Sequence, residues 1–404
     1  MKRIFIADAK RTAVGSFQGA LSKTPATDFA AEVVKDILKT TGVPADKVTE
    51  LICGNVLTAA EGQGPGRQVA IKAGLPNAVP AYSLNMVCGS GMKAIINGVV
   101  GTAFGLGNLV IAGGTENMSI APYLLDGARA GYRMGNKEVI DHMVYDSLTD
   151  AYQKVHMGIT AENVAAKYGI TRQEQDAFAL KSQEKAIAAV DGGKFKNEIV
   201  PIIVKQGKAT VAFDTDEYPN RTTNAEKLAG LRPAFKPDGG TVTAGNASGI
   251  NDGAAFVLLA DEEAVAKYGL KPMAEVIGFG QGGVDPSTMG LGPVPAIREA
   301  LKYTALKLSD MDVIELNEAF AAQALGVVTE LSAEHGMTKE EILAKSNING
   351  GAIALGHPVG ASGARIVVTL GHILAGGDYR YGLASLCIGG GMGTAVVLKK
   401  VHNA

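Results

Sequence analysis

Hydrophobic positions along the chain follow two periods that alternate. Short apolar runs from Ile4 to Ile6 and from Leu109 to Ala112 have the length of buried strands. Between them, apolar residues recur at the spacing of one helix face at Phe29, Val33, Val34, Ile37 and Leu38. Strands that alternate with amphipathic helices predict an α/β fold, and 404 residues with 47% hydrophobic content are enough to bury a large core.

The pattern changes between about residues 119 and 249, where charged and aromatic residues become more frequent and connections lengthen. Within this stretch, Thr171 and Glu174 have the spacing of a capping box and predict the start of a helix that carries Phe178 and Ile187. We therefore expect an inserted domain here, set between an N-terminal and a C-terminal part of the α/β fold.

Two stretches of the chain resemble each other. Residues 88–96 followed by 109–114, and residues 360–368 followed by 383–391, both read as a Gly/Ser-rich turn, a helix and a buried strand that ends in glycines. Because α/β proteins reuse this unit, the pair is a hint rather than a demonstration of two related halves that face each other.

Composition excludes several classes of protein. Lys plus Arg (38) nearly balances Asp plus Glu (40) without long runs of one sign, so nothing marks a nucleic-acid or membrane surface. Apolar runs are also shorter than the roughly 20 residues of a membrane span. The three cysteines are too few and odd in number for a disulfide framework, which favours the cytoplasm. Without a Cys-x-x-Cys or His/Cys cluster, we expect no metal site.

Cys88 is the first candidate for chemistry. It stands in Asn85-Met-Val-Cys88-Gly-Ser-Gly-Met, at the predicted mouth of a helix, where unpaired N–H groups and the helix dipole favour a thiolate. The following glycines allow an acyl group to approach the backbone closely. An arbitrary cysteine is more often a buried structural residue, and we keep that interpretation for Cys53.

His357, Cys387 and Asn317 are further candidates, each with a structural alternative. His357 lies in a glycine-flanked loop that Pro358 stiffens, and we expect an exposed, positioned imidazole of the kind that activates a thiol. Cys387 ends an apolar run before a glycine cluster, where it can equally be a packed core residue. Asn317 precedes a helix as either its cap or the holder of a water near an oxyanion.

Four segments together resemble the thiolase family. They are Asn-Met-Val-Cys88-Gly-Ser-Gly-Met, Asn317-Glu-Ala-Phe, Gly-His357-Pro-Val-Gly-Ala-Ser-Gly and Cys387-Ile-Gly-Gly-Gly-Met-Gly, and they occur in the family's order. The similarity runs from Ala7-Asp-Ala-Lys-Arg-Thr to the last strand. It replaces the structural interpretation of Cys88, His357 and Cys387 but not that of Cys53.

The resemblance implies two pseudo-repeated βαβαβαββ halves in a five-layered α-β-α-β-α core with an inserted loop domain. Residues 1–118, completed by about 250–274, would form the N-terminal half, and 275–404 the C-terminal half. Residues 119–249 would form the loop domain that covers coenzyme A. The resemblance also implies a homo-oligomer, usually a tetramer in the branch that acts on acetoacetyl-CoA.

The resemblance further implies reversible condensation of two acetyl-CoA molecules to acetoacetyl-CoA and CoA. Cys88 would carry the acyl group, His357 would accept its proton, and Cys387 would deprotonate the second acetyl-CoA. His357 and a water on Asn317 would form one oxyanion hole, and the N–H groups of Cys88 and Gly389 the other. No cofactor is expected, because coenzyme A is a substrate or product.

Other positions match the family's substrate contacts. The His156-Met157 pair and Met289 resemble the short-acyl pocket of the acetoacetyl-CoA branch. Ser248 matches a residue that contacts the pantetheine, whereas Arg221 matches a contact to the adenine end in a less typical segment. The complete set implied to bind coenzyme A is Leu148, His156, Met157, Arg221, Phe235, Ala244, Ser248, Met289, Ala319 and Phe320.

Two alternatives remain open at this point. A broader degradative 3-ketoacyl-CoA thiolase would cleave longer substrates well, and His156 argues against it. A noncatalytic thiolase-like protein that binds coenzyme A or lipid is expected to have lost a catalytic residue, whereas Cys88, His357 and Cys387 are all present.

Overall fold

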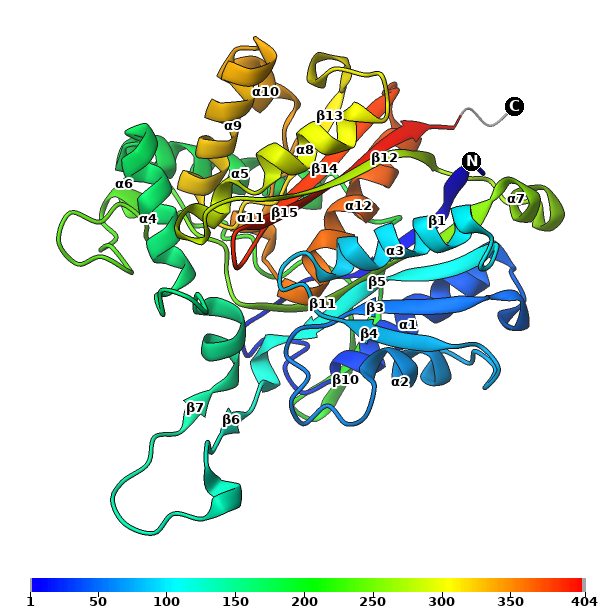
Figure 1. Cartoon of the computed structure of the whole chain (residues 1–404), viewed down its shortest axis with the longest axis horizontal. Helices are drawn as coiled ribbons and strands as arrows, with labels where there is room; N and C mark the ends of the chain where they lie inside the picture. The colour runs from blue at the N-terminus through cyan, green and yellow to red at the C-terminus, as the bar shows by residue number, and fades with distance from the viewer. Residues whose placement is uncertain (1, 402–404) are drawn as a thin grey trace.

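One mixed β-sheet runs through the protein, whose computed structural model describes residues 2–401 and, among these, all side chains except that of Gln206. Its strand order is β13-β14-β15-β12-β1-β11-β5-β3-β4 (Figure 1). These strands are β1 Ile4–Thr12, β3 Glu50–Gly54, β4 Ala81–Leu84, β5 Leu109–Asn117, β11 Asn251–Asp261, β12 Ala274–Gly283, β13 Val313–Leu316, β14 Tyr381–Ile388 and β15 Met392–Lys400.

Strand β1 joins the two halves of the sheet. On one side it pairs antiparallel with β11, from Ile4 opposite Asp261 to Arg11 opposite Ala255. On the other side its first residues pair with β12, where Ile6 lies opposite Ala274. The N-terminal and C-terminal halves therefore share one continuous hydrogen-bonded sheet rather than meeting only through side chains.

Helices cover and separate the two halves in five layers, α-β-α-β-α. Three buried clusters define the layers: helices α1 and α2 pack on the N-terminal strands, α3 and α12 lie between the halves, and α8, α9 and α10 pack on the C-terminal strands (Figure 1). The five-layered fold expected from the sequence is confirmed. These helices are α1 Ala26–Thr41, α2 Pro65–Lys72, α3 Ser90–Phe104, α8 Pro293–Lys302, α9 Ala321–His335, α10 Lys339–Lys345 and α12 Val359–Gly376.

The two central helices approach each other at their N-terminal ends. A Cβ atom on Gly91 of α3 would lie 2.9 Å from both the Gly360 carbonyl oxygen and the Ala364 nitrogen of α12, so only glycine allows this spacing. Residues 87–104 and 359–376 are long and apolar enough to cross a membrane by length and composition alone. Here they are largely buried between the two halves, as expected of core helices.

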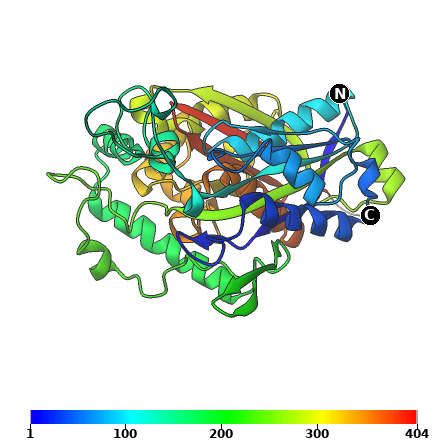
Figure 2. The same ribbon diagram turned by 90° about the horizontal axis from the view of Figure 1, so that it is seen from below.

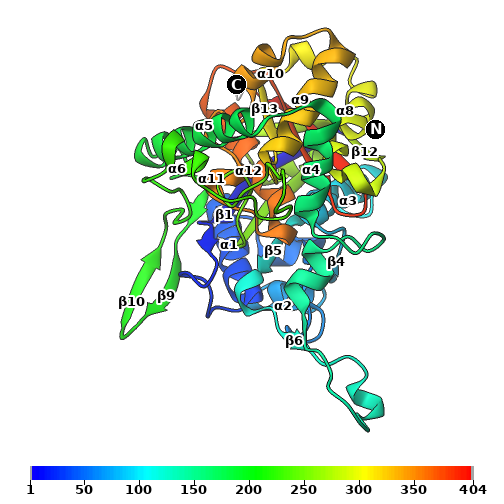
Figure 3. The same cartoon turned by 90° about the vertical axis from the view of Figure 1, so that its left-hand side faces the viewer.

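The inserted segment runs alongside this core. The capping box at Thr171 is present and opens α5, which lies along one side of the molecule (Figure 2). A hairpin of β6 and β7 extends away from the body (Figure 3). The elements of the insert are β6 Tyr123–Leu124, β7 Ile140–Asp141, the π-helix η4 Val144–Leu148, α4 Met157–Tyr168, α5 Arg172–Asp191, β8 Ile199–Val200, β9 Ile202–Gln206, β10 Ala209–Phe213 and α6 Ala225–Ala229.

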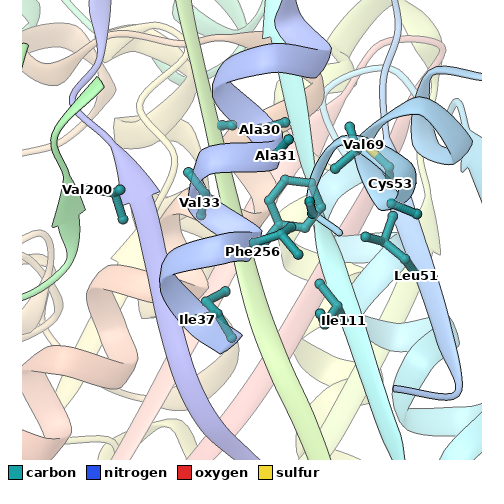
Figure 4. Packing of buried hydrophobic residues seen from close by; sticks show 14 of the residues in the cluster. Ala30, Ala31, Val33, Ile37, Leu51, Cys53, Val69, Ile111, Val200 and Phe256 are labelled. Carbon is teal, nitrogen blue, oxygen red and sulfur yellow. The ribbon is translucent and has the colours of Figure 1, made fainter. Parts of the chain in front are cut away.

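Further short elements include Gly15–Ser16 (β2), Glu262–Tyr268 (α7), Pro286–Leu291 (η5) and Ala352–Leu355 (α11). Cys53 lies in β3 within the N-terminal core, beside Leu51, Val69 and Phe256 (Figure 4). It has no exposed surface, and burial raises the pKa of its thiol well above the ordinary range. Its interpretation as a small core residue is therefore confirmed.

Candidate active site

Cys88 lies in a tight turn between β4 and α3. Val87 before it has φ +46°, a left-handed conformation that strains a β-branched residue. Ser90 holds the turn, because its hydroxyl donates to the Val87 carbonyl (2.7 Å) and accepts from the Met86 N–H (2.8 Å). Cys88 is thus placed at the start of a helix by a strained and hydrogen-bonded backbone.

The ionisation state of Cys88 differs from the expectation of a resting thiolate. Burial raises the pKa of its thiol to about 11, outweighing the N–H groups of Gly389 and of Cys88 itself, which lower it. The helix start is therefore not enough to ionise the sulfur at neutral pH. The same two N–H groups lie within hydrogen-bonding range of the sulfur, beside any acyl group it carries.

Cys387 lies at the end of β14, and its segment contacts the Cys88 turn. A Cβ atom on Gly89 would lie 2.3 Å from the Ile388 Cδ1 atom, and one on Gly389 would lie 3.4 Å from a methyl group of Val87. Burial, and then the nearby charge of Cys88, raise the pKa of Cys387 well above the ordinary range. A charge effect of one cysteine on the other indicates that the two sulfurs are close.

His357 lies in the loop between α11 and α12 and is only 6% exposed, so the expectation of an exposed imidazole is wrong. The glycine-flanked turn is enclosed by the core instead of facing solvent. The backbone N–H of His357 donates to the Asn251 Oδ1 atom (2.9 Å). Burial first, and then the charge of Arg365, lower the pKa of the imidazole to about 4, so it is neutral at pH 7.

The hydroxyl of Ser362 determines the tautomer of this neutral imidazole. Ser362 Oγ donates to the Pro358 carbonyl (2.8 Å), so its own hydrogen is used. It lies 2.5 Å from His357 Nδ1 and must therefore accept a hydrogen bond from Nδ1–H. The Nε2 atom then carries a free lone pair, and it is buried without a hydrogen-bond partner among residues 2–401. This is the arrangement that a general base requires.

Asn317 directly follows β13, next to β14, because its N–H donates to the Ser385 carbonyl (3.0 Å). It is not a helix cap, since α9 begins at Ala321 and its N-cap residue is Phe320. Both polar atoms of its side chain are buried, and neither has a hydrogen-bond partner in the described part of the chain. The amide therefore has donor and acceptor capacity left for a water or a substrate oxygen.

The predicted acyl-pocket residues form one buried cluster. Cys387 belongs to it, and the other predicted members are Met157, Met289, Ala319 and Phe320. Phe235 packs against this cluster and stacks on His156, with ring centroids 4.5 Å apart. Leu148 packs instead against a neighbouring cluster that also adjoins Cys88.

The remaining predicted contacts to coenzyme A lie farther out. Ser248 is tied to the pocket, because its N–H donates to the Ala319 carbonyl (2.9 Å), while Ala244 is exposed nearby. Arg221 forms a two-point ion pair with Asp191 and is 56% exposed. Nothing in the structure brings Arg221 into contact with the cysteine cluster.

Sequence reasoning missed three residues that hold this site: Ser362, Asn251 and Glu116. Ser362 had a detectable signal, because it follows His357 by five residues at a helix start and can reach back to the ring. Asn251 and Glu116 had no detectable signal in the sequence, because their contacts with the His357 loop span 106 and 244 residues, respectively.

Comparison with known proteins agrees with this geometry. Residues 4–263 match the family model of the thiolase N-terminal domain, and residues 270–400 match that of the thiolase C-terminal domain. The fold and the paired cysteines define an acyltransferase enzyme. The chain belongs to the thiolase family.

Relatives and solved structures refine the comparison. An acetyl-CoA acetyltransferase of Chromobacterium violaceum is 54% identical over 98% of this chain and 99% of that protein. The structure of acetyl-CoA acetyltransferase from Syntrophomonas wolfei is 40% identical, with a TM-score of 0.96 over 99% of this chain and 100% of that one. Human mitochondrial 3-ketoacyl-CoA thiolase in complex with CoA is 42% identical, with a TM-score of 0.92 over 99% and 98%.

Proposed function

We propose that this thiolase is an acetyl-CoA acetyltransferase that condenses two acetyl-CoA molecules to acetoacetyl-CoA and CoA, and catalyses the reverse thiolysis. The observation that carries the proposal is that the turn of Cys88 contacts the segment of Cys387 and packs against the buried cluster of Val359, two residues after the neutral imidazole of His357. The similarity to the acetyl-CoA acetyltransferases named above supports it.

In the first half-reaction, the Cys88 sulfur attacks the thioester carbon of acetyl-CoA while Nε2 of His357 accepts the thiol proton. The C–S bond to coenzyme A breaks, and the departing sulfur takes that proton, which leaves acetyl-Cys88 and neutral His357. Since the thiol and imidazole are both neutral at rest, proton transfer must accompany the attack. The N–H groups of Cys88 and Gly389 stabilise the tetrahedral oxyanion.

In the second half-reaction, the Cys387 thiol passes its proton to Nε2 of His357, and the resulting thiolate removes a proton from the methyl group of a second acetyl-CoA. The carbanion attacks acetyl-Cys88, the C–S bond to Cys88 breaks, and the departing Cys88 sulfur takes the proton from His357, which restores both thiols and the neutral imidazole. The raised pKa of Cys387 makes its thiolate a stronger base, closer in proton affinity to a thioester methyl group. The enolate oxygen is held by a water on Asn317 and by His357 in its protonated form.

The residues around Cys387 support a short acyl group. Met157, Met289 and Phe320 belong to the same buried cluster as Cys387, and such bulky side chains around the site favour a short acyl group. The broader 3-ketoacyl-CoA thiolase remains the second candidate, because the human enzyme of that name shares the fold at 42% identity. Rates of thiolysis of acetoacetyl-CoA and of 3-ketohexanoyl-CoA separate the two, and comparable rates would contradict the acetoacetyl-CoA assignment.

Two cysteine variants test the assigned roles. Cys88→Ala is expected to abolish both directions, because no acyl-enzyme can form. Cys387→Ala is expected to be acetylated by acetyl-CoA, detected by mass spectrometry, but scarcely to condense. Condensation by Cys387→Ala at the wild-type rate would refute its role as the base.

The projecting hairpin supports assembly into a homotetramer. Its surface carries apolar side chains that a monomer would leave in water, including Tyr123, Leu125, Met134 and Val139, which are 57–92% exposed. Strand β4 also ends the sheet with an unpaired edge among the described residues. The proposed tetramer would cover both surfaces.

A further inference from the structure

Glu116 is a fully buried carboxylate near the end of β5 that the chemistry above does not use. One of its oxygens accepts hydrogen bonds from the Asn55 side chain (3.0 Å) and the Leu57 N–H (3.0 Å). The other accepts from the Val56 N–H (3.1 Å) and the Gly360 N–H (2.9 Å). Four donors from two distant segments therefore converge on one carboxylate.

This set of contacts fits the ionised form of Glu116. All four partners are N–H donors, so a proton on either oxygen would find no acceptor among them. Burial raises the pKa of Glu116, whereas the N–H groups of Leu57, Val56 and Gly360 lower it by favouring the charged form. Burying such a charge is unfavourable even when it is hydrogen-bonded, and an apolar side chain would be more favourable if only core stability were needed.

The segments that Glu116 holds are those that surround the reacting groups. Val56 and Leu57 form a small buried cluster with Val359, and Cys88 packs against that cluster. Gly360 lies in the first turn of α12, three residues after His357, and so belongs to the C-terminal half. Glu116 is therefore attached both to the apolar wall of Cys88 and to the turn that carries the imidazole.

We propose that Glu116 is a positioning residue of the acyl-transfer site, which sets the His357 turn of the C-terminal half against the Cys88 wall of the N-terminal half. This proposal rests on the function proposed above, which assigns the roles of Cys88 and His357. Asn251 of the neighbouring strand β11 assists, because it accepts from the His357 N–H and donates to the Gly15 carbonyl (3.0 Å).

The variant Glu116→Gln tests this role with little change in shape. In either orientation, the new NH2 group faces two N–H donors, so two of the four hydrogen bonds are lost. Because a displacement of about 1 Å can cost about 100-fold, we expect kcat for acetoacetyl-CoA thiolysis to fall about 10- to 100-fold. The KM for acetoacetyl-CoA should stay close to the wild-type value, since Glu116 does not touch the predicted coenzyme A contacts.

A second readout does not depend on turnover. The rate at which iodoacetamide alkylates Cys88, followed by mass spectrometry, reports the surroundings of the sulfur even if acetoacetyl-CoA is not the substrate. It should change at least several-fold in Glu116→Gln. An inactive wild-type enzyme would defeat the proposed function, whereas an unchanged alkylation rate in the variant would defeat the role of Glu116.

Glu198→Gln is the matched control. Glu198 is also buried and also contacts α12, but in its middle, through the Thr369 hydroxyl (3.1 Å), and it pairs with Arg11. This control should lower the melting temperature while leaving kcat and alkylation unchanged. Should Glu116→Gln fail to fold, Asn55→Ala removes one donor only and should show the same two effects more weakly. Wild-type kcat and alkylation in the folded variants would overturn the proposal.

Discussion

At the scale of single residues, the reactivity of the site depends on which nitrogen of His357 is free. The hydroxyl of Ser362 accepts the Nδ1–H and so leaves the lone pair of the buried Nε2 atom available as a base. Histidine alone would fix neither the proton on Nδ1 nor the free lone pair on Nε2, because the proton of an isolated neutral imidazole exchanges between both nitrogens.

Ser362→Ala is therefore expected to lower the rate of acetyl transfer to Cys88 by about 10- to 100-fold, a part of what general-base catalysis contributes. Single-turnover formation of acetyl-Cys88, followed by quenched-flow mass spectrometry, measures this. Ser346→Ala is a suitable control, since that hydroxyl is also buried and only donates to the Ile342 carbonyl (2.7 Å). Equal rates in the two variants would contradict the tautomer assignment.

The neutral resting state makes a second prediction. With the pKa of Cys88 raised to about 11 and that of His357 lowered to about 4, the thiolate fraction grows with pH across the neutral range. Alkylation of Cys88 by iodoacetamide should accelerate about tenfold per pH unit between pH 7 and 9. A plateau already present at pH 6 would show instead a resting thiolate–imidazolium pair.

Residue chemistry was only partly predictable from the sequence. The identities of Cys88, His357 and Cys387 could be chosen because their glycine-rich segments, taken together and in order, resemble the thiolase family. Their protonation could not, because it depends on burial, and the loop of His357 was expected to be exposed. The hydrogen bonds of Glu116 and Asn251 to the His357 loop could not be predicted either, because no local sequence pattern indicates a hydrogen bond between residues more than 100 positions apart.

At the scale of elements, the site depends on how closely α3 and α12 approach. Periodicity located strands near 4–6 and 109–112 and a helix over 29–38, because packing of these elements follows local patterns. The similarity of residues 88–96 and 109–114 to residues 360–368 and 383–391 hinted at two related halves. The sequence did not predict that α3 and α12 meet, because their contact depends on glycines whose role appears only in three dimensions.

Gly91→Ala tests this contact. Its Cβ would lie 2.9 Å from backbone atoms of α12 that cannot easily yield, so we expect a loss of about 1–3 kcal/mol in the free energy of unfolding, measured by urea denaturation. Gly101→Ala in the same helix is the opposite case. Its Cβ would meet only the Leu106 side chain at 4.0 Å, and the variant should gain about 0.5–1 kcal/mol. Destabilisation of both alike would contradict the close-contact explanation.

At the scale of the whole molecule, the hairpin between β6 and β7 is separate from the chemistry. We expect that replacing residues 125–139 with two glycines leaves each subunit active but converts the proposed tetramer into a dimer. The reason is that the exposed apolar side chains of the hairpin are lost while the unpaired edge of β4 is kept. Light scattering coupled to size exclusion measures the mass, and a persisting tetramer would contradict this role.

Because β1 pairs with strands of both halves, it cannot take its place in the sheet until those later strands have been synthesised. Strand β1, Ile4–Thr12, has its partners in β11 and β12, some 250 residues downstream. At roughly 5–20 residues per second, these partners emerge on the order of 10 to 50 seconds later. During that interval an apolar strand without its neighbours is available to chaperones and to other nascent chains, and the native sheet can close only after β12 has been made.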